Sequence, residues 1–136
     1  MQYKTKFIFP LILVLSTTTF AQSTQELFDE KCGVCHTTVK PTPEARSSFV
    51  APPAMGVMFH VKEAFGDNKE MAIAFIKDYV LNPSADKAKC LPKSIKRFGL
   101  MPSQQGVITE EELDKVAKYM YENFPQKEFE PKHEGI

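Results

Sequence analysis

The sequence predicts an all-α domain of about four to five helices, and three observations support this fold class. No stretch of the 136 residues alternates apolar and polar side chains with the period of two that a half-buried strand requires. Ser23 with Glu26, and Thr109 with Glu112, have the form of capping boxes, which begin helices. Apolar residues then recur at steps of three and four, as on the buried face of a helix.

The first predicted helix begins at Thr24, and Leu27 and Phe28 give it an apolar side. It runs into Cys32, where we expect it to open. The following segment, 37–53, contains four prolines. Because proline removes a backbone donor and disfavours helix before it, this segment is predicted to be a loop. A loop of that length in a compact domain usually serves a function, such as wrapping a cofactor.

Two middle helices are predicted over 54–65 and 69–81, with Asn68 capping the second. The second carries a stripe suited to burial, formed by Met71, Ala72, Phe75, Ile76, Tyr79 and Val80. A short turn of helix is expected over 84–90. Residues 91–106 hold two prolines and two glycines and are predicted to be irregular.

The last predicted helix follows Thr109 and has the clearest amphipathic pattern in the chain. Its apolar positions are Leu113, Val116, Ala117, Met120, Tyr121 and Phe124. Pro125 ends this helix, and the polar residues 126–136 are predicted to form a frayed tail.

The N-terminus has the three parts of a secretory signal peptide. Lys4 and Lys6 supply the positive start, residues 7–15 the apolar stretch, and Thr19-Phe20-Ala21 a cleavage site. The apolar stretch is short for a bilayer span, and Pro10 interrupts it. A cleaved signal peptide is therefore predicted, and an uncleaved membrane anchor is the alternative. We therefore expect export to the periplasm and no stable membrane span after cleavage.

Cleavage of the signal peptide, residues 1–21, would leave one domain over 22–125 and the tail over 126–136. The chain has 17 basic and 17 acidic residues and no sustained basic stripe with interleaved aromatics. This composition gives no reason to expect nucleic acid as a partner. We expect the protein to be a monomer.

The segment Cys32-Gly33-Val34-Cys35-His36 carries the strongest chemical signal in the sequence. Two cysteines two residues apart, with a histidine directly after the second, have the spacing that attaches haem covalently. Each thiol would bond one former vinyl group at the porphyrin edge, and His36 would bind the iron from the proximal side. The predicted cofactor is therefore one covalently attached haem c with its iron.

Cys-x-x-Cys also occurs in thiol–disulfide oxidoreductases and in zinc sites. The oxidoreductases place it at a strand-to-helix junction, and no strand is predicted here. A zinc site built from Cys32, Cys35, Cys90 and either His36 or His60 has enough ligands, but their spacing is irregular.

From Thr24 to Pro125 the chain resembles a class I, single-haem c-type cytochrome. Its parts follow the family's order: Phe28 four residues before the first haem cysteine, Cys-Gly-Val-Cys-His, a proline loop, middle helices, a Met-Pro loop, and a final helix. The resemblance implies a cytochrome c-like fold around one covalent haem. It also implies that the first and last helices cross near the haem edge, where Phe28 and Tyr119 would meet.

Met101 is the predicted sixth ligand of the iron, opposite His36. It lies in an irregular segment, and Pro102 holds the backbone extended beside it. The stretch from Phe98 to Pro102 is similar to the family's distal-ligand loop, and the resemblance implies that Phe98 lines the haem pocket. The remaining candidates for this position are Met55, Met58, Met71, Met120, His60 and His133.

The resemblance further implies that the second nitrogen of the His36 imidazole donates to a carbonyl of the proline loop. Either Pro52 or Pro53 would supply this carbonyl. Such a hydrogen bond fixes the tautomer and the orientation of the ring.

Two other features have a structural and a functional interpretation. Cys90 is predicted to be a small buried core residue, with an exposed thiol that forms an intermolecular disulfide as the alternative. A basic cluster precedes the Met-Pro loop, and it is either a solvated face or a collar that steers an acidic redox partner. Its members are Lys87, Lys89, Lys93, Lys96 and Arg97.

The function predicted from these residues and from the resemblance is that of an exported electron carrier without a substrate site of its own. It would exchange electrons with redox partner proteins that the sequence does not identify. The alternative is a haem enzyme or sensor with a labile sixth ligand, either peroxidase-like or gas-binding.

Overall fold

A computed structural model describes residues 22–39 and 42–129, and within these residues all regular structure is helical. The all-α prediction is therefore confirmed for this part of the chain. The predicted signal peptide and His133 lie outside it. The elements in chain order are α1 (Thr24–Phe28), the π-helix η1 (Asp29–Gly33), the 3₁₀-helix η2 (Ala45–Ser48), α2 (Ala54–Phe65), α3 (Lys69–Leu81), α4 (Pro92–Phe98) and α5 (Glu110–Asn123).

Three helices, α1, α3 and α5, begin where their capping residues predicted. At α1 the Glu26 amide donates to the Ser23 hydroxyl at 3.2 Å, and the Ser23 amide donates to the Glu26 carboxylate at 2.8 Å. Thr109 and Glu112 form the same reciprocal pair at α5, with the same two distances. The Asn68 side chain accepts from the Met71 amide at the start of α3. Each cap satisfies amides that the first turn of a helix leaves without an intrahelical partner.

The first helix does not open at Cys32 as expected. Instead α1 continues directly into η1, which ends one residue later, at Gly33. The chain then turns tightly, with the amides of Cys35 and His36 both donating to the Cys32 carbonyl, at 3.1 and 2.8 Å. Short π-helical stretches occur frequently at functional sites.

The expectation of an irregular segment over 91–106 is wrong for α4, which spans Pro92–Phe98. Pro92 stands in the first turn, where proline's missing amide costs nothing and its fixed φ suits a helix. Gly99, with φ of 76°, ends α4 in a conformation that glycine adopts without strain. The predicted proline loop likewise contains the short helix η2. Over 84–90 the chain makes a single turn, closed by the Ala88 amide and the Ser84 carbonyl.

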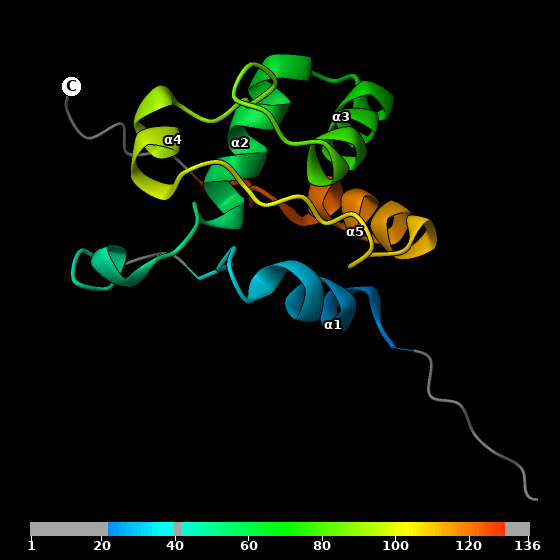
Figure 1. Cartoon of the computed structure of the whole chain (residues 1–136), viewed down its shortest axis with the longest axis horizontal. Coiled ribbons are helices and arrows are strands. Elements are labelled where there is room, and N and C mark those ends of the chain that lie inside the picture. The colour runs from blue at the N-terminus through cyan, green and yellow to red at the C-terminus, as the bar shows by residue number, and fades with distance from the viewer. Residues whose placement is uncertain (1–21, 40–41, 130–136) are drawn as a thin grey trace, which may run out of the picture.

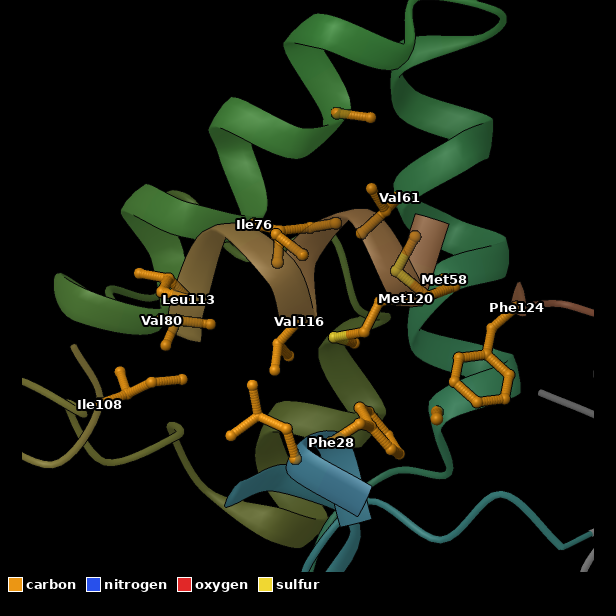
Figure 2. Close-up of a cluster of buried hydrophobic side chains, with 14 of the residues drawn as sticks. Phe28, Met58, Val61, Ile76, Val80, Ile108, Leu113, Val116, Met120 and Phe124 are labelled. Atoms are coloured by element: carbon orange, nitrogen blue, oxygen red, sulfur yellow. The ribbon is translucent and has the colours of Figure 1, made fainter. Parts of the chain in front are cut away.

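The core forms around α5, which packs against α1, α2 and α3. Figure 1 shows α5 between α1 on one side and α2 with α3 on the other. Figure 2 shows side chains from these four helices gathered at the centre. The largest fully buried side chains are Phe28, Met58, Leu113 and Val116.

The structure corrects two predictions, the burial of Met71 and the fraying of the chain directly after Pro125. Met71, predicted to belong to the buried stripe of α3, is 56% exposed because it lies in the first turn, outside the row of Ala72, Ile76 and Val80. The predicted frayed tail is wrong at its start, because Phe129 packs against the core. Its ring lies 6.1 Å from that of Phe59 on α2.

No helix within the described residues has the length and apolar character that crossing a membrane requires.

Candidate haem site

The Cys-x-x-Cys-His segment lies at the end of η1, where the helix meets the core. Cys32 is half-buried and packs against the core cluster, whereas Cys35 is exposed. Neither cysteine forms a disulfide bond. Burial, together with the nearby Cys35, raises the pKa of the Cys32 thiol to about 11. The Cys32 thiol is therefore protonated at neutral pH.

The His36 ring is held by the proline loop. Its Nδ1 lies 2.8 Å from the Pro52 carbonyl oxygen, which can accept a hydrogen bond from this nitrogen only when Nδ1 carries the proton. That tautomer leaves the lone pair of Nε2 available to a metal. Burial lowers the pKa of His36, and the Pro52 carbonyl partly opposes this effect. The imidazole is therefore neutral at neutral pH, which is the form that binds iron.

The two prolines left open by the sequence have different partners. The Pro53 carbonyl accepts from the Val57 amide at 3.1 Å, so it belongs to the first turn of α2. The Pro52 carbonyl precedes the helix and faces His36. A second bond across the same junction, from the Ala54 amide to the Thr37 carbonyl at 2.9 Å, ties the segment after His36 to the start of α2.

Three aromatic rings meet where α1 crosses α5. The Phe28 ring lies 5.6 Å from that of Tyr119 and 5.4 Å from that of Phe124, and the last two are 5.9 Å apart. These tilted and edge-on arrangements are favourable for aromatic pairs. Phe28 and Tyr119 are therefore in contact, and their place beside a haem edge stays a prediction.

The methionines differ in their surroundings. Met55, Met58 and Met120 are buried in the core on helices, and Met71 is exposed on α3. Met101 alone among the described methionines after residue 22 lies outside a helix, half-buried against the core. It belongs to the segment between α4 and α5, which crosses the face of the molecule in Figure 1.

His60 and Phe98, two further candidates, contact residues of their own helices. His60 Nδ1 lies 3.0 Å from a Glu63 carboxylate oxygen on the same helix, and its ring meets Phe59 edge-on. Phe98 is half-buried, with the Arg97 guanidinium 4.7 Å from its ring centre.

Several members of the basic cluster are engaged within the molecule. Lys87 pairs with Asp78 at 2.6 Å, and the Lys89 ammonium lies over the rings of Phe65 and Phe75. Arg97 donates to the Arg46 carbonyl and so joins α4 to η2. Intramolecular contacts therefore explain part of this cluster without a partner.

Cys90 is half-buried rather than fully buried, and burial raises the pKa of its thiol. Within residues 22–39 and 42–129, no three His, Cys, Asp or Glu side chains are grouped so as to hold a metal ion. The zinc alternative therefore finds no ligand cluster there.

The sequence prediction missed the residues that secure the segment after Met101. Ser103, Gln104 and Gln105 bond to the carboxyl end of α3. The sequence held one indication of these contacts, the run of polar residues directly after Met101-Pro102. Polar side chains in an irregular segment can satisfy backbone groups that have no partner in a helix or sheet.

The donor set of this site suits a haem. It offers two cysteine side chains at the required spacing and a neutral imidazole oriented by a backbone carbonyl. Together with the helical fold, these features define a c-type cytochrome domain. A protein-family model described as "Cytochrome C oxidase, cbb3-type, subunit III" matches residues 20–120, and the chain belongs to this family.

A protein of Aquifex aeolicus (strain VF5), described as uncharacterized, is similar to this chain. The two are 34% identical over 117 residues, which cover 77% of this chain and 76% of the relative. No solved structure was found to match. The family implies haem c with its iron as cofactor and a redox role with partner proteins.

Proposed function

We propose that this protein is an exported, single-haem c-type cytochrome that carries electrons between redox partner proteins. In this proposal Cys32 and Cys35 hold the haem covalently, and His36 and Met101 bind its iron. The observation that supports it most directly is the 2.8 Å contact between His36 Nδ1 and the Pro52 carbonyl. This contact presets the tautomer and the ring orientation that a proximal ligand needs.

The residues of the chain have distinct tasks in this function. A bound haem c supplies a one-electron couple between ferric and ferrous iron. The Pro52 carbonyl holds His36 in place. A methionine thioether as the sixth ligand favours the reduced state and raises the potential relative to a second histidine. If His36 and Met101 both bind the iron, they would leave it no coordination site for a substrate.

The ligand assignment can be tested on the holoprotein, produced in a host that attaches haem c. Thioether ligation gives ferric haem a weak far-red absorption band. We expect the Met101→Leu variant to lose this band, because leucine has no thioether, and the Met55→Leu variant to retain it. Both substitutions conserve side-chain volume, so the fold should be retained. Intact-mass measurement should show one haem per chain in all three proteins.

Two results would contradict the proposal at different levels. A chain that carries no haem after maturation in a competent host refutes the cytochrome function as a whole. A far-red band that survives in Met101→Leu refutes only the ligand assignment.

The alternative function, a haem enzyme or sensor, requires a sixth ligand that leaves easily. Carbon monoxide would then bind the ferrous protein rapidly at neutral pH. We expect slow or absent binding, because Met101 is half-buried and its segment is bonded to α3. Rapid binding by the unmodified protein would favour the alternative.

A further inference from the structure

The carboxyl end of α3 is capped by the segment that follows Met101. The last carbonyls of a helix have no intrahelical partner and carry a partial negative charge, so they attract donors. The Val80 carbonyl accepts from the Gln104 amide at 3.0 Å. The Leu81 carbonyl accepts twice, from the Ser103 hydroxyl at 2.6 Å and from Gln105 Nε2 at 3.1 Å.

Gln105 makes a further contact that fixes its side chain. The same Nε2 lies 2.9 Å from Asn82 Oδ1, so one amide group bridges a backbone and a side-chain acceptor. The Gln105 amide in turn donates to the Ser103 hydroxyl at 3.3 Å, which links the two donors. We call Ser103, Gln104 and Gln105 the latch.

The latch lies next to the predicted sixth ligand. Ser103 is two residues from Met101, a distance of at most about 7 Å along an extended chain. The intervening Pro102 restricts the backbone, and its carbonyl accepts from Gln104 Nε2 at 2.9 Å. On the other side of the latch, Ile108 is buried in the core. A shift of the latch would therefore move Met101.

We propose that Ser103 and Gln105 are positioning residues, which hold Met101 on the iron by fastening its segment to the carbonyl groups at the end of α3. This inference rests on the proposed function, because it requires Met101 to be the sixth ligand. It adds that the bond between the Met101 sulfur and the iron is stabilised by hydrogen bonds, each of which joins residues more than twenty positions apart in the chain.

A purely structural role for the latch predicts something different. If it served only to cap α3, its loss would lower global stability and leave the exchange of the sixth ligand unchanged. The two roles separate when ligand exchange is measured under conditions where the protein stays folded.

The test uses the holoprotein with Ser103→Ala and Gln105→Glu, singly and combined. Gln105→Glu keeps the shape of the side chain but replaces its donor with a carboxylate that faces two acceptors. Ser48→Ala is the matched control, because the Ser48 hydroxyl donates to the Ala45 carbonyl at 2.7 Å within its own turn. Ser103→Thr, which keeps the hydroxyl, is the conservative variant.

In the combined variant we expect carbon monoxide to bind the ferrous form about tenfold faster, as the loss of two or three hydrogen bonds allows. As the pH is raised, the far-red band should disappear at a pH about one unit lower than in the unmodified protein, since one pH unit corresponds to a tenfold change in the equilibrium. Amide hydrogen exchange at Gln104 should accelerate by a similar factor. Ser48→Ala and Ser103→Thr should match the unmodified protein in all three measurements.

The outcomes distinguish this inference from the proposed function. If the unmodified holoprotein lacks the far-red band, or Met101→Leu keeps it, the ligand assignment itself fails. If the assignment holds but the latch variants match Ser48→Ala in band pH and binding rate, the latch inference is wrong. Should the combined variant not fold, the single variants decide, since each must show part of the same acceleration.

Discussion

At the scale of single residues, Phe28, the last residue of α1, links the core to the segment that carries Cys32. Its side chain is fully buried, and it packs against the rings of Tyr119 and Phe124. Because α1 ends at Phe28 and η1 follows directly, this contact also fixes the position of η1, which carries Cys32. One side chain thus joins the core to the Cys-x-x-Cys-His segment.

We expect Phe28→Ala to lower the free energy of unfolding by about 3–5 kcal/mol, because it leaves a cavity in a packed core. Val107→Ala serves as the control, since Val107 is 59% exposed, and it should change stability by no more than about 0.5 kcal/mol. Urea unfolding of the two holoproteins gives both values. Equal stabilities would show that the aromatic contact between α1 and α5 does not hold the fold.

At the scale of elements, α5 is the central helix and depends on its capping box. Thr109 and Glu112 satisfy two amides reciprocally, and Glu112 also lies 3.7 Å from the Lys31 ammonium on η1. Hydrogen bonds from the Thr109 backbone and hydroxyl lower the pKa of Glu112, and Lys31 adds to the effect. The start of α5 is therefore linked to the segment that carries Cys32.

Thr109→Ala should destabilise the holoprotein by about 1 kcal/mol, the usual cost of losing a helix cap. Thr109→Ser keeps the hydroxyl and should retain most of the stability. Chemical unfolding monitored by far-UV circular dichroism measures the difference. The prediction is wrong if the alanine and serine variants unfold at the same denaturant concentration.

At the scale of the whole molecule, carboxyl groups on α3 and α5 have lowered pKa values because lysines donate hydrogen bonds to them. Hydrogen bonds from Lys118 and Lys77 lower the pKa of Asp114, and one from Lys87 lowers the pKa of Asp78. These pairs are solvent-exposed, so each contributes modestly. Since the unfolded chain binds protons more readily at these groups, their contribution is complete above the unfolded-state pKa values and is lost as pH falls through the folded-state values.

We therefore expect stability to decrease on acidification below about pH 4, where ordinary carboxyl groups begin to protonate. Thermal unfolding of the holoprotein at pH 7, 5 and 3 measures the trend. In Asp114→Asn the decrease between pH 5 and pH 3 should be smaller, because one of the responsible carboxylates is gone. An unchanged slope in that variant would exclude Asp114 as a contributor.

Local signals predicted much of this molecule correctly. The caps at Ser23, Asn68 and Thr109, and the bounds of α2 and α3, followed from residues within one or two helical turns. The same locality explains the error at α4, where Pro92 was interpreted as a breaker although it stands in the first turn. Both results have one cause, since capping and proline effects act within a few residues.

The sequence alone determined the helical fold class, the order of the main helices and the Cys-x-x-Cys-His motif, because each depends on spacing along the chain. Only the tertiary structure decided between the carbonyls of Pro52 and Pro53, and only it brought Ser103 and Gln105 to Leu81. These contacts join residues 16 to 24 positions apart, and their geometry depends on how the helices pack.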